Sequence, residues 1–150
     1  MLETNPFVDP SFAAAIIAGF AAQILKVLMD YLRNKSWNPA LFLRAGGMPS
    51  SHSAMVAALT QALGLYHGFG SPLFAISATL AVIVIYDATG IRRQAGKHAA
   101  VINQMIRELA SGHPLQQERL GEVLGHTPLE AIAGMVLGIV VAQIIWFIWR

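Results

Sequence analysis

Residues 131–149 read AIAGMVLGIVVAQIIWFIW and contain no Asp, Glu, Lys or Arg. An uncharged apolar run of about 18 or more residues is typical of a helix that crosses a membrane. Two further uncharged runs, 11–25 and 45–86, lie earlier in the chain. Together these runs predict an integral membrane protein of the all-α class, folded as a helical bundle.

The overall composition supports this interpretation. Hydrophobic residues make up 55% of the chain and charged residues only 12%, which is too few for the surface of an ordinary soluble domain. The length of 150 residues predicts a single domain over residues 1–150. The net charge of +2 is too small to indicate nucleic acid binding, and the absence of cysteine excludes disulfides. The N-terminus lacks the basic segment and the cleavage site of a signal peptide, so we expect no removable leader.

Four membrane-spanning helices are predicted, together with one amphipathic helix at the membrane interface. The spans are expected at about 12–32, 51–67 (with Ser50 or Ser51 as the cap), 72–88 and 129–149. The sequence GFGSP at 68–72 predicts a tight turn between the second and third spans. Between the last two spans, apolar residues recur at helical spacing opposite a polar face, which predicts a helix lying in the interface. These apolar residues are Ala95, Ala99, Ile102, Ile106 and Leu109.

Four spans would bring the polar segments of the chain to one face of the membrane. GGMPSSHSA (46–54) separates the first two spans, DATGIRR (87–93) ends the third, and GHTPLE (125–130) begins the fourth. Successive crossings place all three segments on one side, and both termini and the turn at 68–72 on the other. An active site requires this kind of convergence.

The first polar cluster, PSSH, begins the second span. Ser50 and Ser51 lie where the free N–H groups and the dipole of a helix N-terminus favour an anion. His52 can carry a proton near neutral pH. Together they would bind an oxyanion and donate a proton, although the same residues are equally typical of a helix cap followed by a hydrated histidine.

Several basic side chains are candidates for anion binding. Arg92 and Arg93 offer forked donors that suit phosphate or carboxylate, and Asp87 could pair with one of them. Alternatively, two arginines at a membrane edge bind lipid headgroups. Lys26 lies inside the first span, where an unpaired ammonium is costly unless its side chain snorkels to the interface. Arg33 lies two turns further along the same helix face.

The segment GHTPLE pairs an imidazole with a carboxylate. His126 and Glu130 are four residues apart, so they share one face of a helix. A carboxylate in this position can hold one ring nitrogen and leave the other nitrogen nucleophilic. The alternative is a hydrogen-bonded helix start at which the dipole favours Glu130. The sequence has no HExxH pattern and no Cys/His set, so a metal site is not favoured.

These motifs resemble those of the type 2 phosphatidic acid phosphatase superfamily. GMPSSHSA is similar to its central PSGH motif, with Ser51 at the Gly position. GHTPLEAIAG is similar to the end of its third motif, with Glu130 at the Asp position. The arginine of that third motif corresponds to Arg92 or Arg93, with a long insertion before His126.

The first motif of the superfamily also has a counterpart. Lys26 and Arg33 match its spacing, with Asn34 in place of a proline. The whole pattern, from Lys26 to Gly134, most resembles the small divergent branch that is often labelled acid phosphatase/vanadium-dependent haloperoxidase-related. The resemblance therefore implies the fold and the chemistry of that branch.

The resemblance implies a phosphatase that needs no metal and no cofactor. His126 would attack phosphorus and form a phosphohistidine, Glu130 would orient it, and His52 would protonate the leaving oxygen. The phosphate oxygens would be held by Lys26, Arg33, Ser50, Ser51 and one of Arg92 and Arg93, with Gly47 and Asp87 in support. Positioned cations and amides stabilise the charge of phosphoryl transfer, so side chains can replace a metal.

The predicted function is hydrolysis of a lipid phosphate monoester or pyrophosphate. The expected partners are membrane lipid and this phosphorylated substrate, and four short spans indicate a homo-oligomer as well. The alternatives are a non-catalytic protein that binds anionic lipid or a partner through the same pocket, and a transporter or scaffold packed through Gly134 and Gly138. A haloperoxidase is not favoured, because it would need bound vanadate and a route for an oxidant.

The expected location is a multi-pass position in the membrane, which is the cell inner membrane if the source is bacterial. Basic residues crowd the predicted site face, and the positive-inside rule would place that face in the cytoplasm. Related membrane members face outward, so the two arguments give opposite orientations.

Overall fold

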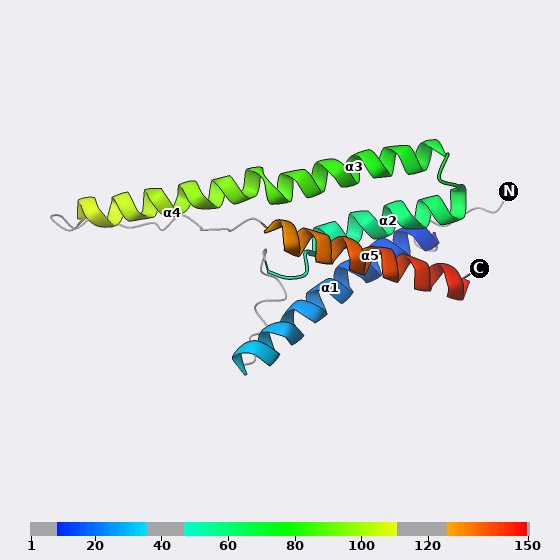
Figure 1. Cartoon of the computed structure of the whole chain (residues 1–150), viewed down its shortest axis with the longest axis horizontal. Coiled ribbons are helices and arrows are strands. Elements are labelled where there is room, and N and C mark those ends of the chain that lie inside the picture. The colour runs from blue at the N-terminus through cyan, green and yellow to red at the C-terminus, as the bar shows by residue number, and fades with distance from the viewer. Residues whose placement is uncertain (1–8, 36–46, 111–125, 150) are drawn as a thin grey trace.

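The computed structural model describes residues 9–35, 47–110 and 126–149, and every regular element in these ranges is a helix. The helices are α1 (Pro10–Asn34), α2 (Ser51–His67), α3 (Pro72–Thr89), α4 (Ile91–Ala110) and α5 (Pro128–Trp149). The second helix packs against α1, α3 and α5, so it lies at the centre of the bundle (Figure 1). The predicted all-α class is confirmed.

Among the described residues, three helical stretches are long and apolar enough to cross a membrane. They are Pro10–Asn34, Pro72–Arg107 and Pro128–Trp149. The second of these stretches joins α3 to most of α4. The one expected span that is not among these three is α2, which has 17 residues and is the shortest of the five helices. Its crossing of the membrane stays a prediction.

Local capping explains where the helices begin. The Asp9 carboxylate accepts hydrogen bonds from the N–H groups of Ser11 (2.8 Å) and Phe12 (3.2 Å), and a proline occupies the first turn of α1. Ser71 caps α3 in the same way, with its hydroxyl accepting from the N–H of Phe74 at 3.2 Å. The turn predicted at 68–72 is therefore confirmed, and it ends at the cap of α3.

Small side chains allow the central helices to approach closely. The buried core consists of Ala14, Ala18, Ala22, Ala54, Ala58, Ala62, Ala142 and Ile145. A Cβ atom on Gly134 of α5 would collide with the carbonyl oxygen of Ser50, and one on Gly138 would collide with that of Ala54. The GxxxG pattern therefore packs α5 onto α2 within the chain.

The amphipathic helix expected after the third span is present as α4, and the structure adds its direction. Figure 1 shows α4 continuing the line of α3 beyond the bundle. Hydrogen bonds run through the junction, because the N–H of Gly90 donates to Tyr86 O (2.8 Å) and the N–H of Gln94 donates to Gly90 O (3.1 Å). With no proline between Tyr86 and Gln94, the helical ladder continues and the chain does not turn.

The fold predicts which positions label from the same side of the membrane. The chain has no native cysteine, so single cysteines can be placed at Met48, Thr127 and Gly70 without background. The N–H of Ser50 donates to the carbonyl oxygen of Glu130, so Met48 and Thr127 lie where α2 and α5 begin, whereas Gly70 follows the other end of α2. A membrane-impermeant maleimide should therefore label the first two together and Gly70 from the opposite side. Labelling of positions 48 and 70 from one side would contradict a crossing by α2.

Candidate active site

The starts of α2 and α5 and the end of α3 meet at one end of the bundle. The N–H of Ser50 donates to the carbonyl oxygen of Glu130 at 3.0 Å, which joins the segment before α2 to α5. The N–H of His126 donates to the carbonyl oxygen of Ala88 at 3.0 Å, which joins the segment before α5 to α3. These two bonds bring together the three polar segments that the sequence places far apart.

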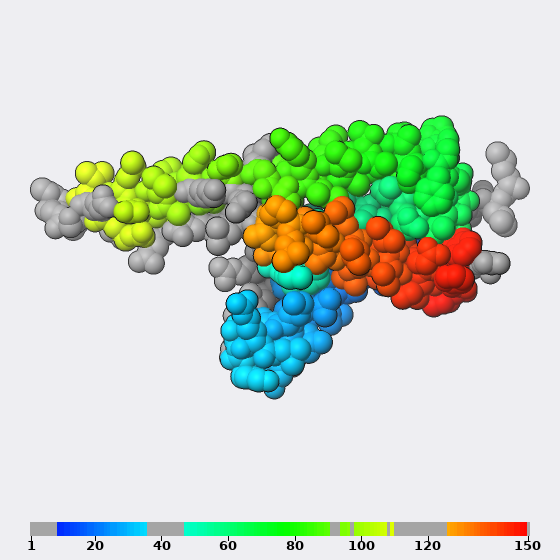
Figure 2. All heavy atoms as spheres, in the orientation of Figure 1, coloured from blue at the N-terminus to red at the C-terminus, as the bar shows by residue number. Residues whose placement is uncertain are grey.

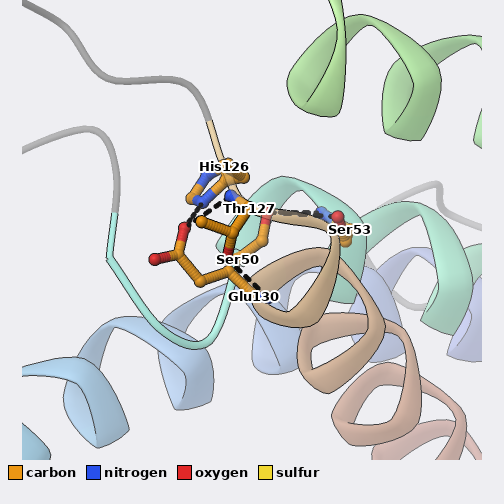
Figure 3. Close-up of polar contacts among 5 residues, drawn as sticks. All are labelled: Ser50, Ser53, His126, Thr127 and Glu130. Carbon is orange, nitrogen blue, oxygen red and sulfur yellow. Dashed lines mark hydrogen bonds and ion pairs between the residues drawn. The ribbon is translucent and has the colours of Figure 1, made fainter. Parts of the chain in front are cut away.

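His126, Thr127 and Glu130 form a closed hydrogen-bonded unit at the start of α5 (Figure 3). The Nδ1 atom of His126 lies 3.1 Å from Oε2 of Glu130, and the N–H of Thr127 donates to the same oxygen at 3.1 Å. In return, the N–H of Glu130 donates to the hydroxyl of Thr127 at 3.3 Å. This reciprocal pattern is a capping box, which fixes the Glu130 carboxylate in place.

The capping box determines what the imidazole of His126 can do. With the proton on Nδ1, the ring donates to the carboxylate of Glu130 and keeps a lone pair on Nε2. His126 is only 6% exposed, so its ring is held by packing as well as by this bond. Thr127 was not among the predicted site residues, although the pattern T-x-x-E before an apolar run signals such a cap.

Lys26 of α1 provides a positive charge beside this unit. Its side chain is 6% exposed, and its ammonium interacts electrostatically with Glu130. Its aliphatic stem packs on Gly47, where an added Cβ would lie 3.4 Å from Cδ of Lys26. Gly47 has φ of 86°, a left-handed conformation that favours glycine. Lys26 is therefore packed inside the bundle, where its charge acts on the carboxylate that orients His126.

The PSSH segment forms the N-terminus of α2. The hydroxyl of Ser50 accepts two hydrogen bonds from Ser53, one from its N–H (3.4 Å) and one from its side-chain hydroxyl (3.1 Å), so Ser50 acts as a buried helix cap. Ser51 is buried in the first turn, whereas the side chain of His52 is exposed. An exposed imidazole at this point can exchange protons with water and with a bound ligand.

The other predicted residues are Arg33, Arg92, Arg93 and Asp87, and they differ in position. Arg33 is exposed in the last turn of α1, where α1 projects from the bundle (Figure 2). The backbones of Arg92 and Arg93 lie in the first turn of α4, and their side chains lie outside the described residues. Asp87 is half-buried next to Ala88, whose carbonyl oxygen binds His126. The structure thus brings Lys26, Gly47, Ser50, His126 and Glu130 together and leaves Arg33 apart.

Comparison with known sequences agrees with these motifs. Residues 7–141 match a family described as the divergent PAP2 family. The chain belongs to the divergent PAP2 family. It is also 39% identical over 155 aligned residues to the uncharacterized membrane protein YuiD of Bacillus subtilis (strain 168), and the alignment covers 96% of each chain. No solved structure matches the chain.

Family membership confirms the resemblance that the motifs indicated. A relative named as a membrane protein and three candidate spans support the prediction that this divergent PAP2 protein is an integral membrane protein. Its candidate site combines an oriented imidazole, a buried ammonium and a helix N-terminus. These are groups that can form a bond to phosphorus and stabilise the charge on phosphate oxygens.

Proposed function

We propose that this divergent PAP2 protein is a membrane phosphatase that hydrolyses a lipid phosphate monoester or pyrophosphate through a phosphohistidine. The main support is the 3.1 Å contact between Nδ1 of His126 and Oε2 of Glu130 at a buried position. An imidazole held in this way presents Nε2 as a nucleophile. The ammonium of Lys26, which interacts electrostatically with Glu130, adds the positive charge that attracts a phosphate.

In the first step, Nε2 of His126 attacks phosphorus, and the bond from phosphorus to the lipid oxygen breaks as the N–P bond forms. The leaving oxygen takes a proton from the imidazolium of His52. In the second step, water attacks phosphorus, the N–P bond breaks, and the neutral imidazole of His52 accepts the proton of the water. Inorganic phosphate leaves, and both histidines return to their starting states.

The phosphate oxygens gain negative charge during both steps, so positive groups near them lower the barrier. We assign this role to Lys26, to the first N–H groups of α2 near Ser51, and to one of Arg92 and Arg93. Arg33 would join them only if the end of α1 moved towards the bundle, since its side chain is exposed where α1 projects.

The position of the site supports a lipid as the substrate. The candidate site lies where α2 and α5 begin and α3 ends, beside helices that are apolar enough to cross a membrane. A headgroup phosphate at the membrane surface lies at the end of such spans. We therefore propose a multi-pass protein, in the cell inner membrane if the source is bacterial, whose site faces the headgroup layer.

Phosphate release from purified protein tests the proposed function. A panel of lipid phosphate monoesters and pyrophosphates in detergent micelles should include at least one substrate that the wild-type protein hydrolyses. His126→Ala should release none, and His67→Ala should match the wild type, because His67 lies at the opposite end of α2. If the wild type binds these lipids but releases no phosphate, the protein is a non-catalytic lipid-binding member.

A further inference from the structure

A buried polar atom near the candidate site has no partner. The side-chain carbonyl oxygen of Gln23, on α1, is buried and accepts no hydrogen bond within the part of the chain that the structure describes. Buried polar atoms in folded proteins are almost always hydrogen bonded, to protein or to bound molecules. This carbonyl oxygen therefore requires an explanation.

Two contacts between α1 and the chain around α2 show where Gln23 lies. A Cβ atom on Gly19 of α1 would meet Cγ of Met55 at 2.7 Å, so these residues face each other. Further along α1, the stem of Lys26 packs on Gly47, just before α2 begins. The order of these contacts shows that α1 and α2 run in opposite directions. Gln23 lies between the two contacts in sequence, and so it lies between them along α2.

Gln23 is about midway between these two contacts, at the height of residues 50–52, where α2 begins. Gln23 therefore lies beside the N-terminus of α2. It also precedes Lys26 by three residues, which puts the two side chains on neighbouring positions of one helix face. The unpartnered carbonyl oxygen thus belongs to the face of α1 that carries Lys26, at the level where α2 begins.

We propose that Gln23 is a further binding residue of this site, whose carbonyl oxygen accepts a hydrogen bond from an O–H group bound beside the phosphate. This inference rests on the proposed function. A phosphate dianion offers only acceptors, so it cannot satisfy a carbonyl oxygen, whereas an O–H group can. The O–H group belongs either to the headgroup of the lipid or to the water that attacks the phosphohistidine.

The two sources act in different steps. A headgroup hydroxyl would bind Gln23 before the N–P bond forms, and it would determine which lipids bind well. The attacking water would bind Gln23 afterwards, with one hydrogen held by the carbonyl oxygen and its lone pair directed at phosphorus. Its other proton then passes to His52 as the N–P bond breaks and the new O–P bond forms.

The test compares two substitutions of glutamine by methionine, which keeps the side-chain length and removes the hydrogen bonds. Gln23→Met is the test, and Gln61→Met is the matched control, since the Gln61 amide donates to Gln143 Oε1 at 3.4 Å in the middle of the bundle. Either kcat or kcat/KM of Gln23→Met should be lower by about fivefold or more than that of the control, the loss expected for one uncharged hydrogen bond.

Two arms identify the source of the O–H group. Rapid quenching should show slower phosphohistidine breakdown in Gln23→Met if the attacking water is bound. If a headgroup hydroxyl is bound instead, Gln23→Met should have a raised KM for a monoacyl glycerol phosphate and an unchanged KM for the deoxy analogue of that lipid. Equal behaviour of Gln23→Met and Gln61→Met in turnover, breakdown and KM would overturn the inference.

A wild-type protein without phosphatase activity would refute the proposed function, and binding then decides the role of Gln23. The two lipids are titrated into the wild-type, Gln23→Met and Gln61→Met proteins. Weaker binding of the hydroxylated lipid to Gln23→Met alone, with the deoxy analogue unaffected, would support the inference. Equal binding of each lipid to all three proteins would overturn it.

Discussion

His126→Ala should abolish phosphate release from every substrate, whereas His52→Ala should lower kcat/KM, which reports formation of the phosphohistidine, mainly on alkyl lipid phosphates. The nucleophile is needed whatever group leaves, and His126 is the imidazole that Glu130 orients at 3.1 Å. A general acid matters only when the leaving oxygen is basic, as a lipid alkoxide is. His52→Ala should therefore lose about 10²-fold or more on an alkyl lipid phosphate and far less on an aryl phosphate.

The measurement is kcat/KM of each variant on an alkyl lipid phosphate and on an aryl phosphate with an acidic leaving group. His67→Ala is the control, because this exposed histidine lies at the far end of α2. Rescue of His126→Ala by the acidic leaving group would reverse the two roles. Full activity of both His126→Ala and His52→Ala would contradict the proposed phosphohistidine mechanism.

Gly134→Ala should destabilise the bundle and displace the site together. A Cβ at this position would collide with the carbonyl oxygen of Ser50, and backbone cannot rotate away as a side chain can. The N–H of Ser50 binds the carbonyl oxygen of Glu130, so separating α5 from α2 would also move the capping box. Overpacking costs about 1–3 kcal/mol of unfolding free energy, which exceeds the gain of about 1 kcal/mol from replacing a helical glycine by alanine.

The midpoint of thermal unfolding in detergent and the phosphatase activity should both fall in Gly134→Ala. Gly70→Ala is the matched control, since a Cβ there would meet nothing within 4 Å and this glycine lies at the opposite end of the bundle. A Gly134→Ala protein that melts with the wild type would show that α5 and α2 do not meet as closely as described.

Local features of the site could be predicted from sequence. The contact between His126 and Glu130 follows from the spacing of four residues on one helix, and the cap at Ser50 lies immediately before an apolar run. The order of the apolar helices also follows from the three uncharged runs, the second of which is divided by the turn at 68–72. Each of these features depends on neighbours within one or two turns, which a sequence displays directly.

Features that depend on how helices pair could not be predicted in this way. Arg33 shares a face with Lys26, yet it is exposed, because α1 crosses the bundle at an angle and its last turns leave it (Figures 1 and 2). The packing of Lys26 on Gly47 and the level of Gln23 beside α2 depend on the relative register of α1 and α2. The residue pattern within one helix does not indicate how that helix is aligned with its neighbour.

The direction of the helix after α3 has a similar explanation. An amphipathic pattern predicts a helix with two faces, but it does not determine the angle at which that helix leaves its predecessor. The angle depends on Gly90, where the hydrogen-bond ladder continues from Tyr86 to Gln94. A single glycine can either end a helix or continue it, so the sequence alone left both directions open.

Detection of phosphate bound to His126 tests the central claim most directly. Wild-type protein mixed with a hydrolysable lipid phosphate and quenched in alkali should carry an acid-labile phosphoryl group, which mass spectrometry should locate on His126. Glu130→Gln, which keeps the side-chain size and removes the carboxylate charge, should form it more slowly. Phosphate release that continues in the wild type without any phosphohistidine, or with the phosphoryl group on another residue, would contradict the account.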